Sequence, residues 1–173
     1  MDLQYPVGRF DWRTKPGDAE RRKAIDEIAV LPAAMRKAVH GLTEEQLNTP
    51  YRPSGWTVRQ VAHHVPDSHL NAYVRFKLAL TEDRPTIKPY DEKRWAELPD
   101  VENTPIGISL TMLEALHERW VVLLRSIEPQ DFSRTFIHPA AGEMDLDKVV
   151  CHYAWHGRHH VGHITSLRQR MGW

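Results

Sequence analysis

Residues 151–173, CHYAWHGRHHVGHITSLRQRMGW, decide the fold class of this chain. Apolar residues recur in this stretch at helical spacing and share one face, which is formed by Tyr153, Gly157, Val161, Ile164 and Leu167. Asp145, a short distance upstream, is a natural N-cap. The pattern therefore predicts a helix from Asp145 to Arg170, with five of the chain's eleven histidines packed into residues 151–163.

Three further stretches show the same periodicity, and together the four predict an all-α four-helix bundle. They run from Asp18 to His40, from Thr57 to Leu80 and from Pro105 to Ile127. Pro66 falls inside the second, where the continuing apolar pattern favours a bend over an end of the helix. A short helical turn capped by Thr43 is expected at 43–47.

Two irregular connectors join the predicted helices. Residues 81–104 form a long, proline-containing connector, of the kind that serves as a functional lid or as a crossover between helices. Residues 128–144 contain PAAGEM, which resembles a hairpin turn and allows two short strands. No internal repeat divides the chain, so we expect one domain over residues 1–173.

The amino-acid composition limits the classes of molecule that this chain is expected to bind. Lys plus Arg equals Asp plus Glu at 23 each, which leaves no net field to attract a nucleic-acid backbone or an anionic membrane. The single cysteine, Cys151, cannot form an intramolecular disulfide, and no stretch has the length of a membrane span. A cytoplasmic protein with small-molecule partners is expected.

Two histidines of the last helix, His156 and His160, border its apolar face on a helical wheel. A buried polar side chain without a partner costs about 1–3 kcal/mol, so two adjacent ones are expected to share a partner. Residues at i and i+4 lie on the same side of a helix, close enough for both rings to reach one metal ion. The spacing therefore favours a metal site, although an isolated HxxxH is a weak signal.

The helix predicted at 57–80 offers a third ligand, because His64 lies at the border of its apolar face. The same wheel turns His63 towards solvent and places His69 inside the apolar face, as a hydrogen-bonded core histidine. Three residues share the border with His64 and are candidates for binding substrate: Ser68, Asn71 and Arg75.

The remaining histidines and the cysteine have simpler interpretations. His159 and His163 are expected at the surface, unless one of them supports a ligand. Cys151 points away from the histidine face, which favours a structural thiol over a nucleophile. Gly157 stands where a metalloprotease HExxH motif carries its glutamate, which argues against peptide hydrolysis.

The stretches GWTVRQVAHHVPDSHLNAYVRFKLAL, residues 55–80, and HYAWHGRHHVGHITSLRQRMGW, residues 152–173, resemble the DinB-like superfamily and specifically its YfiT branch. The resemblance covers nearly the whole chain. It implies a four-helix bundle with a long crossover, often dimeric, that binds one zinc or nickel ion through three histidines. By position these are His64, His156 and His160.

Members of the branch are described both as metal-dependent hydrolases and as bacillithiol S-transferases. We expect transfer of a low-molecular-weight thiol to a small electrophile in detoxification, because a thiolate held by a metal needs no general base. Metal-dependent hydrolysis of a small ester or amide by hydroxide formed at the metal is the alternative, and a non-catalytic metal-binding bundle is a third possibility. Asp67 is the nearest candidate base, in a supporting or surface position.

Overall fold

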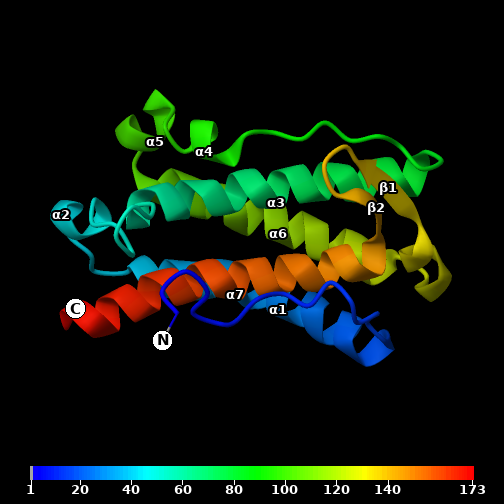
Figure 1. The fold of residues 1–173 in the computed structure, drawn as a ribbon, viewed down its shortest axis with the longest axis horizontal. Coiled ribbons are helices and arrows are strands. Elements are labelled where there is room, and N and C mark those ends of the chain that lie inside the picture. Colours follow the sequence, from blue (N-terminus) through cyan, green and yellow to red (C-terminus); the bar gives the residue numbers. More distant parts are fainter. Residues whose placement is uncertain (1) are drawn as a thin grey trace.

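The computed structural model describes residues 2–173 and confirms the four-helix bundle (Figure 1). No helix in this range combines the length and the apolar character that crossing a membrane requires. The four long helices lie along the long axis of the molecule, and they are α1 (Asp18–Val39), α3 (Val58–Thr81), α6 (Ile106–Ser126) and α7 (Leu146–Met171).

The order of the helices around the bundle is not that of a simple up-and-down bundle. In an up-and-down bundle, helices that follow one another in the chain lie side by side. Here α1 packs against α6 and α7, and α3 packs against the same two helices. The consecutive helices α1 and α3 are therefore placed diagonally, so that α3 and α7, the two helices predicted to carry the metal ligands, become neighbours.

The helix termini follow from local capping chemistry. The Thr57 side chain accepts a hydrogen bond from the Gln60 amide, and Asp145 accepts one from the Lys148 amide, as expected of N-cap residues. Pro32 and Pro66 lie inside α1 and α3, and both helices continue through them. Pro66 therefore does not shorten α3.

Short elements occupy the connectors, as Figure 1 shows. Helix α2 (Glu44–Leu47) is capped by Thr43, as predicted. The long connector carries α4 (Glu92–Trp95) and α5 (Pro99–Asn103) beside α3. After the 3-10 turn η1 (Pro129–Ser133), strands β1 (Thr135–His138) and β2 (Gly142–Asp145) form the expected antiparallel hairpin.

The apolar core consists of two clusters at opposite ends of the bundle. The hairpin end is built around Phe76, Trp120 and Phe136, and the other end around Met35, Leu113 and Ile164. Along α7 the first cluster ends at Ala154 and the second begins at Ile164, and the histidines of α7 beyond His152 fall between them. A layer of imidazoles therefore separates the two clusters, at a depth where a charge would be costly.

Candidate metal centre

The structure brings together His64 from α3 and His156 and His160 from α7. The Nε2 atom of His156 lies 3.4 Å from that of His64 and 3.2 Å from that of His160. The potential ligand atoms of the three residues all lie within 4.8 Å of one another. These are the three histidines that the helical periodicity of the sequence indicated as candidate metal ligands.

The trio is suited to a divalent metal ion. Two nitrogens bound to one tetrahedral zinc ion stand about 3.3 Å apart, given a zinc–nitrogen bond of about 2.0–2.1 Å. By contrast, 3.4 Å is long for a hydrogen bond between two rings. The spacing observed for both ring pairs therefore matches the edges of a metal tetrahedron.

Protonation also favours metal binding. Burial lowers the pKa of His64 to about 4. Burial, followed by the neighbouring imidazoles, holds the pKa values of His156 and His160 well below the usual 6.5. Neutral imidazole is the form that binds metals, so all three rings can offer a lone pair at neutral pH.

The three rings are held by different neighbours. Trp56 packs over His64 with ring centroids 4.6 Å apart and lies nearly parallel to His160 at 6.4 Å. His156 has a polar contact behind it, because its Nδ1 atom lies 3.2 Å from Nε2 of His69. The Nδ1 atom of His160 has no hydrogen-bond partner within residues 2–173.

A cavity of about 590 Å³ opens beside the three histidines. Of the predicted substrate-binding residues, Ser68 and Arg75 line it. Asn71 does not, because its side chain instead donates a hydrogen bond to the Asp67 carbonyl. Asp67 also lies outside the cavity wall, half-buried, where burial and then the nearby Asp100 raise its pKa to about 6.

Two formally charged side chains of opposite sign, Arg75 and Glu92, line this cavity. Arg75 is its one Lys or Arg among the described residues, and it forms no ion pair within residues 2–173. Its charge adds to burial in lowering the pKa values of His138 and His152, which line the same cavity. Among the described lining residues Glu92 is the sole acidic one, and it is exposed.

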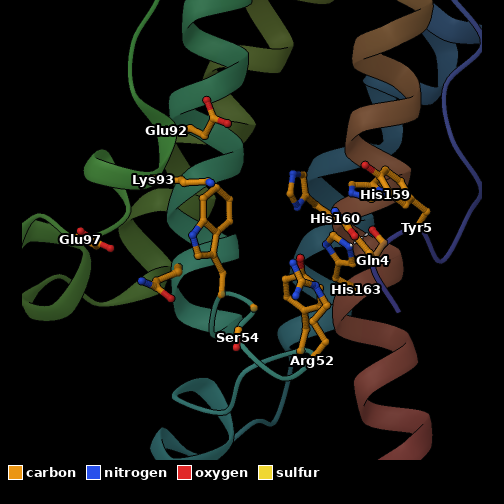
Figure 2. Close-up of a pocket in the computed structure, with 14 residues that line it drawn as sticks. Gln4, Tyr5, Arg52, Ser54, Glu92, Lys93, Glu97, His159, His160 and His163 are labelled. Atoms are coloured by element: carbon orange, nitrogen blue, oxygen red, sulfur yellow. Dashed lines mark hydrogen bonds between the residues drawn. The ribbon is translucent and has the colours of Figure 1, made fainter. Parts of the chain in front are cut away.

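A second cavity of about 560 Å³ adjoins the first and shares five lining residues with it: Tyr5, Trp56, Glu92, His159 and His160. Figure 2 shows His159, His160 and His163 along α7, close to Gln4 and Tyr5, with Glu92 and Lys93 of the α4 region across the hollow. His160 therefore borders two adjoining cavities.

The prediction that His159 and His163 lie at the surface is wrong. Both are buried, because residues 4–8 run along α7 and cover this part of the helix (Figure 1). The Gln4 carbonyl lies 3.1 Å from His163 Nε2, and the Gly8 carbonyl accepts a hydrogen bond from Trp155 Nε1 at 3.0 Å. We call residues 4–8 the N-terminal strap.

The prediction for His63 is also wrong, because this side chain is buried rather than exposed to solvent. Its Nδ1 atom lies 2.7 Å from Ser109 Oγ on α6, so this side of α3 faces a neighbouring helix. His69 is fully buried, as predicted, but two other histidines contact it. Cys151 packs beside the core, where burial and then Asp147 raise its pKa to about 11, which disfavours a thiolate.

Several residues at the site were not found from the sequence. His117 contacts His69 on the side away from His156. Its burial could have been predicted from the sequence, because it follows Leu113 by four positions and precedes Trp120 by three, in the buried stripe of α6. Trp56 and Tyr90 reach the cavity from irregular segments, and Glu92 from the four-residue helix α4, which is too short to show periodicity.

The bundle and its histidine trio define a class of helical proteins with a candidate metal centre between two helices. The chain belongs to the DinB superfamily, whose model matches residues 27–164. Its fold is also that of YfiT from Bacillus subtilis, described as a probable metal-dependent hydrolase with an unusual four-helix bundle topology. That structure superposes with a TM-score of 0.96 at 46% identity, over 100% of this chain and 99% of the other.

Curated relatives are similar along their whole length. A protein of Bacillus mycoides and one of Bacillus anthracis, each named "Putative metal-dependent hydrolase", are both 55% identical over 172 residues, covering 99% of either chain. These names and the histidine cluster together suggest metal dependence.

Proposed function

We propose that this protein is a metal-dependent S-transferase that joins a low-molecular-weight thiol, such as bacillithiol, to small electrophiles. His64, His156 and His160 would hold one divalent ion, Zn²⁺ or Ni²⁺, since three neutral imidazoles suit both. The observation that carries the proposal is the convergence of three Nε2 atoms beside a cavity that is rich in imidazoles and poor in acids.

When bound, such an ion would keep a thiol deprotonated, or lower the pKa of a water molecule to about 7. Abstraction of a proton from water benefits from a nearby base, whereas a thiolate needs none once it is formed. Glu92 is the one acidic residue among the described residues that line the cavity beside the trio, and it is exposed on α4. Glu97, also exposed, lines the adjoining cavity, and Asp67 lines neither. The scarcity of carboxylates therefore favours a thiol as the nucleophile.

The two adjoining cavities support a reaction with two organic reactants. Both are bordered by His160, and each is large enough for a small molecule. Hydrolysis needs room for one organic substrate, whereas transfer needs room for a thiol and an electrophile together. The shared wall of Tyr5, Trp56 and His159 would also keep bulk water from the reacting groups.

Arg75 is the residue we assign to binding an anionic group of the thiol or of the electrophile. It has no carboxylate partner within residues 2–173, and Tyr153 of the neighbouring helix α7 lines the same cavity. A guanidinium can bind a carboxylate or phosphate through two parallel hydrogen bonds. In this proposal Arg75 would bind the anionic group, and the three histidines that line the same cavity would bind the metal.

Metal-dependent hydrolysis is the second candidate, and one observation favours it: relatives that are 55% and 46% identical to this chain are described as putative or probable metal-dependent hydrolases. In this case Glu92 is the lining residue with the chemistry of a general base. The substrate would be a small ester or amide with an anionic group.

Turnover assays separate the two candidates. Protein loaded with Zn²⁺ or Ni²⁺ is mixed with bacillithiol and a fluorogenic electrophile, and separately with chromogenic esters. We expect mass spectrometry to detect a thiol conjugate, and we expect this product to be lost after chelation and in the His160→Ala variant. The control variant His40→Ala alters an exposed histidine outside the site and should still form the conjugate. Ester turnover without thiol that is lost on chelation would overturn transfer in favour of hydrolysis.

A further inference from the structure

Behind His156, a line of three imidazoles runs through the core to a backbone carbonyl. The Nδ1 atom of His156 lies 3.2 Å from Nε2 of His69. Nδ1 of His69 lies 3.0 Å from Nε2 of His117, and Nδ1 of His117 lies 2.7 Å from the carbonyl oxygen of Ile28. The line crosses from α7 through α3 and α6 to α1, so it contacts all four long helices.

The surroundings of the two inner rings require them to be neutral. His69 is 0% exposed and His117 is 1% exposed. Aromatic rings of Trp120 and Tyr153 pack against them. No carboxylate of residues 2–173 is hydrogen-bonded or ion-paired to either ring, and an unpaired buried charge is far costlier than a neutral hydrogen-bonded group.

The carbonyl at the end of the line then decides where every proton lies. A carbonyl oxygen only accepts, so His117 must carry its hydrogen on Nδ1 and offer a lone pair at Nε2. His69 must in turn donate from Nδ1 to that lone pair, which leaves its own Nε2 as an acceptor. His156 therefore donates from Nδ1 to His69, and its Nε2 is a bare lone pair directed at His64 and His160.

We infer that His69 and His117 are positioning residues that fix the tautomer and orientation of the ligand His156, using the Ile28 carbonyl as the reference point. The inference rests on the proposed function only in taking His156 as a metal ligand. A ligand histidine commonly donates its second N–H to a carbonyl or carboxylate directly. Here the carbonyl acts through two further rings.

His160 provides the internal contrast. Its Nδ1 atom is buried and has no partner within residues 2–173, so packing against Trp56 and its neighbours orients this ring. Of these two ligands from α7, His156 has a hydrogen-bonded support and His160 does not. Loss of the support should therefore act on the metal centre through His156.

The tautomers can be read without any turnover. Long-range ¹⁵N–¹H spectra of the full chain with labelled histidine report which ring nitrogen carries hydrogen, before and after Zn²⁺ is added. We expect His117, His69 and His156 to carry hydrogen on Nδ1 in the metal-free protein, with Zn²⁺ changing the Nε2 signal of His156 alone among the three. A hydrogen on Nε2 of His69 or His117 would overturn the inference.

Metal affinity, measured by competition with a chromophoric chelator, tests the consequence. His117→Phe removes the acceptor for His69 and should weaken Zn²⁺ binding by about 10–100-fold. His117→Gln has both an N–H and a carbonyl oxygen and should recover most of the affinity. His63→Phe is the matched control, since it replaces another buried histidine that lies outside the line, and it should bind as the unaltered protein does.

Unchanged affinity in a folded His117→Phe variant would overturn the positioning role. If His117→Phe does not fold, the spectra of the unaltered chain still decide the tautomers. Failure of the unaltered protein to bind any divalent ion is a separate outcome. It would overturn the proposed metal centre and remove the role of His69 and His117 as supports of a ligand.

Discussion

Gly157 of α7 and Leu31 of α1 are in such close contact that no side chain fits between the two helices. A β-carbon built at position 157 would stand 2.5 Å from Leu31 Cδ2 and 3.1 Å from Leu31 Cγ. Leu31 is itself buried in the core. Because Gly157 directly follows His156, this contact sets how deeply the metal-ligand segment of α7 sits in the bundle.

Gly157→Ala should destabilise the protein by about 1–3 kcal/mol, because the added methyl group overpacks the α1–α7 contact. It should also weaken metal binding by displacing His156 and His160. Gly107→Ala is the control, since nothing lies within 4 Å of a β-carbon there, and a helical alanine is more stable than glycine by up to about 1 kcal/mol. Urea unfolding measures both, and equal midpoints would contradict the expected overpacking.

Removal of one ligand should be distinguishable from removal of its neighbour. His160→Ala is expected to abolish stoichiometric metal binding, whereas His159→Ala should retain it, because His159 packs beside Tyr5 and Trp155 instead of joining the trio. Metal content of protein purified without a histidine tag, measured by mass spectrometry, provides the comparison. Equal loss in both variants would refute the choice of ligands.

Arg75→Gln should raise the KM for an anionic reactant by roughly tenfold or more, which is the scale of a lost hydrogen bond to a charged group. The effect on kcat should be small, since Arg75 acts on binding. Lys77→Gln removes an exposed positive charge from the same helix, where Lys77 lies over Tyr73, and should leave KM unchanged. A similar rise in KM for both variants would indicate that positive charge on this helix attracts the reactant in general, without a specific binding site at Arg75.

The metal-free protein should lose stability as the solution is acidified from about pH 6.5 to about pH 4. Burial lowers the pKa to about 4 at His64, His117, His152 and His159. In this range the unfolded chain binds protons that the folded chain cannot, so the free energy of unfolding decreases as pH falls.

Two carboxyl groups act in the opposite direction: Asp147, whose pKa is raised by burial, and Asp67. Burial and then Asp100 raise the pKa of Asp67 to about 6, so its contribution is present at low pH and is lost as pH rises through that value. Four histidines outweigh two carboxyl groups. Urea midpoints of chelated protein at about pH 7.5 and about pH 5 should therefore differ, and a higher midpoint at the lower pH would contradict this prediction.

Helix positions were predictable because capping and periodicity are local. The predicted range Asp18–His40 ends one residue beyond α1, and Thr57 and Asp145 lie at the start of their helices as N-caps. The same periodicity distinguished His64 from the rest of its helix. The diagonal placement of α1 and α3 could not be predicted from local patterns, because it depends on which helices pack against each other in the folded bundle.

The wrong predictions of exposure have one physical origin: a helical wheel describes the pattern of one helix and contains no information about the segments that pack against it. His63 is buried because α6 presents Ser109 to it. His163 is buried because Gln4 covers it and Tyr51 stacks on its ring at 3.8 Å. Gln4 and Tyr51 both come from outside the long helices, so no periodic signal marks them.

The N-terminal strap has a consequence for the order in which the molecule assembles. The strap's bonds to α7 join residues 147 and 159 positions apart in the chain. Closing such large loops costs chain entropy before the contacts can stabilise the structure, so contacts between distant residues form slowly. We therefore expect the wall over His159 and His163 to be among the last parts of the molecule to form, so that the complete cavity is a property of the fully folded chain alone.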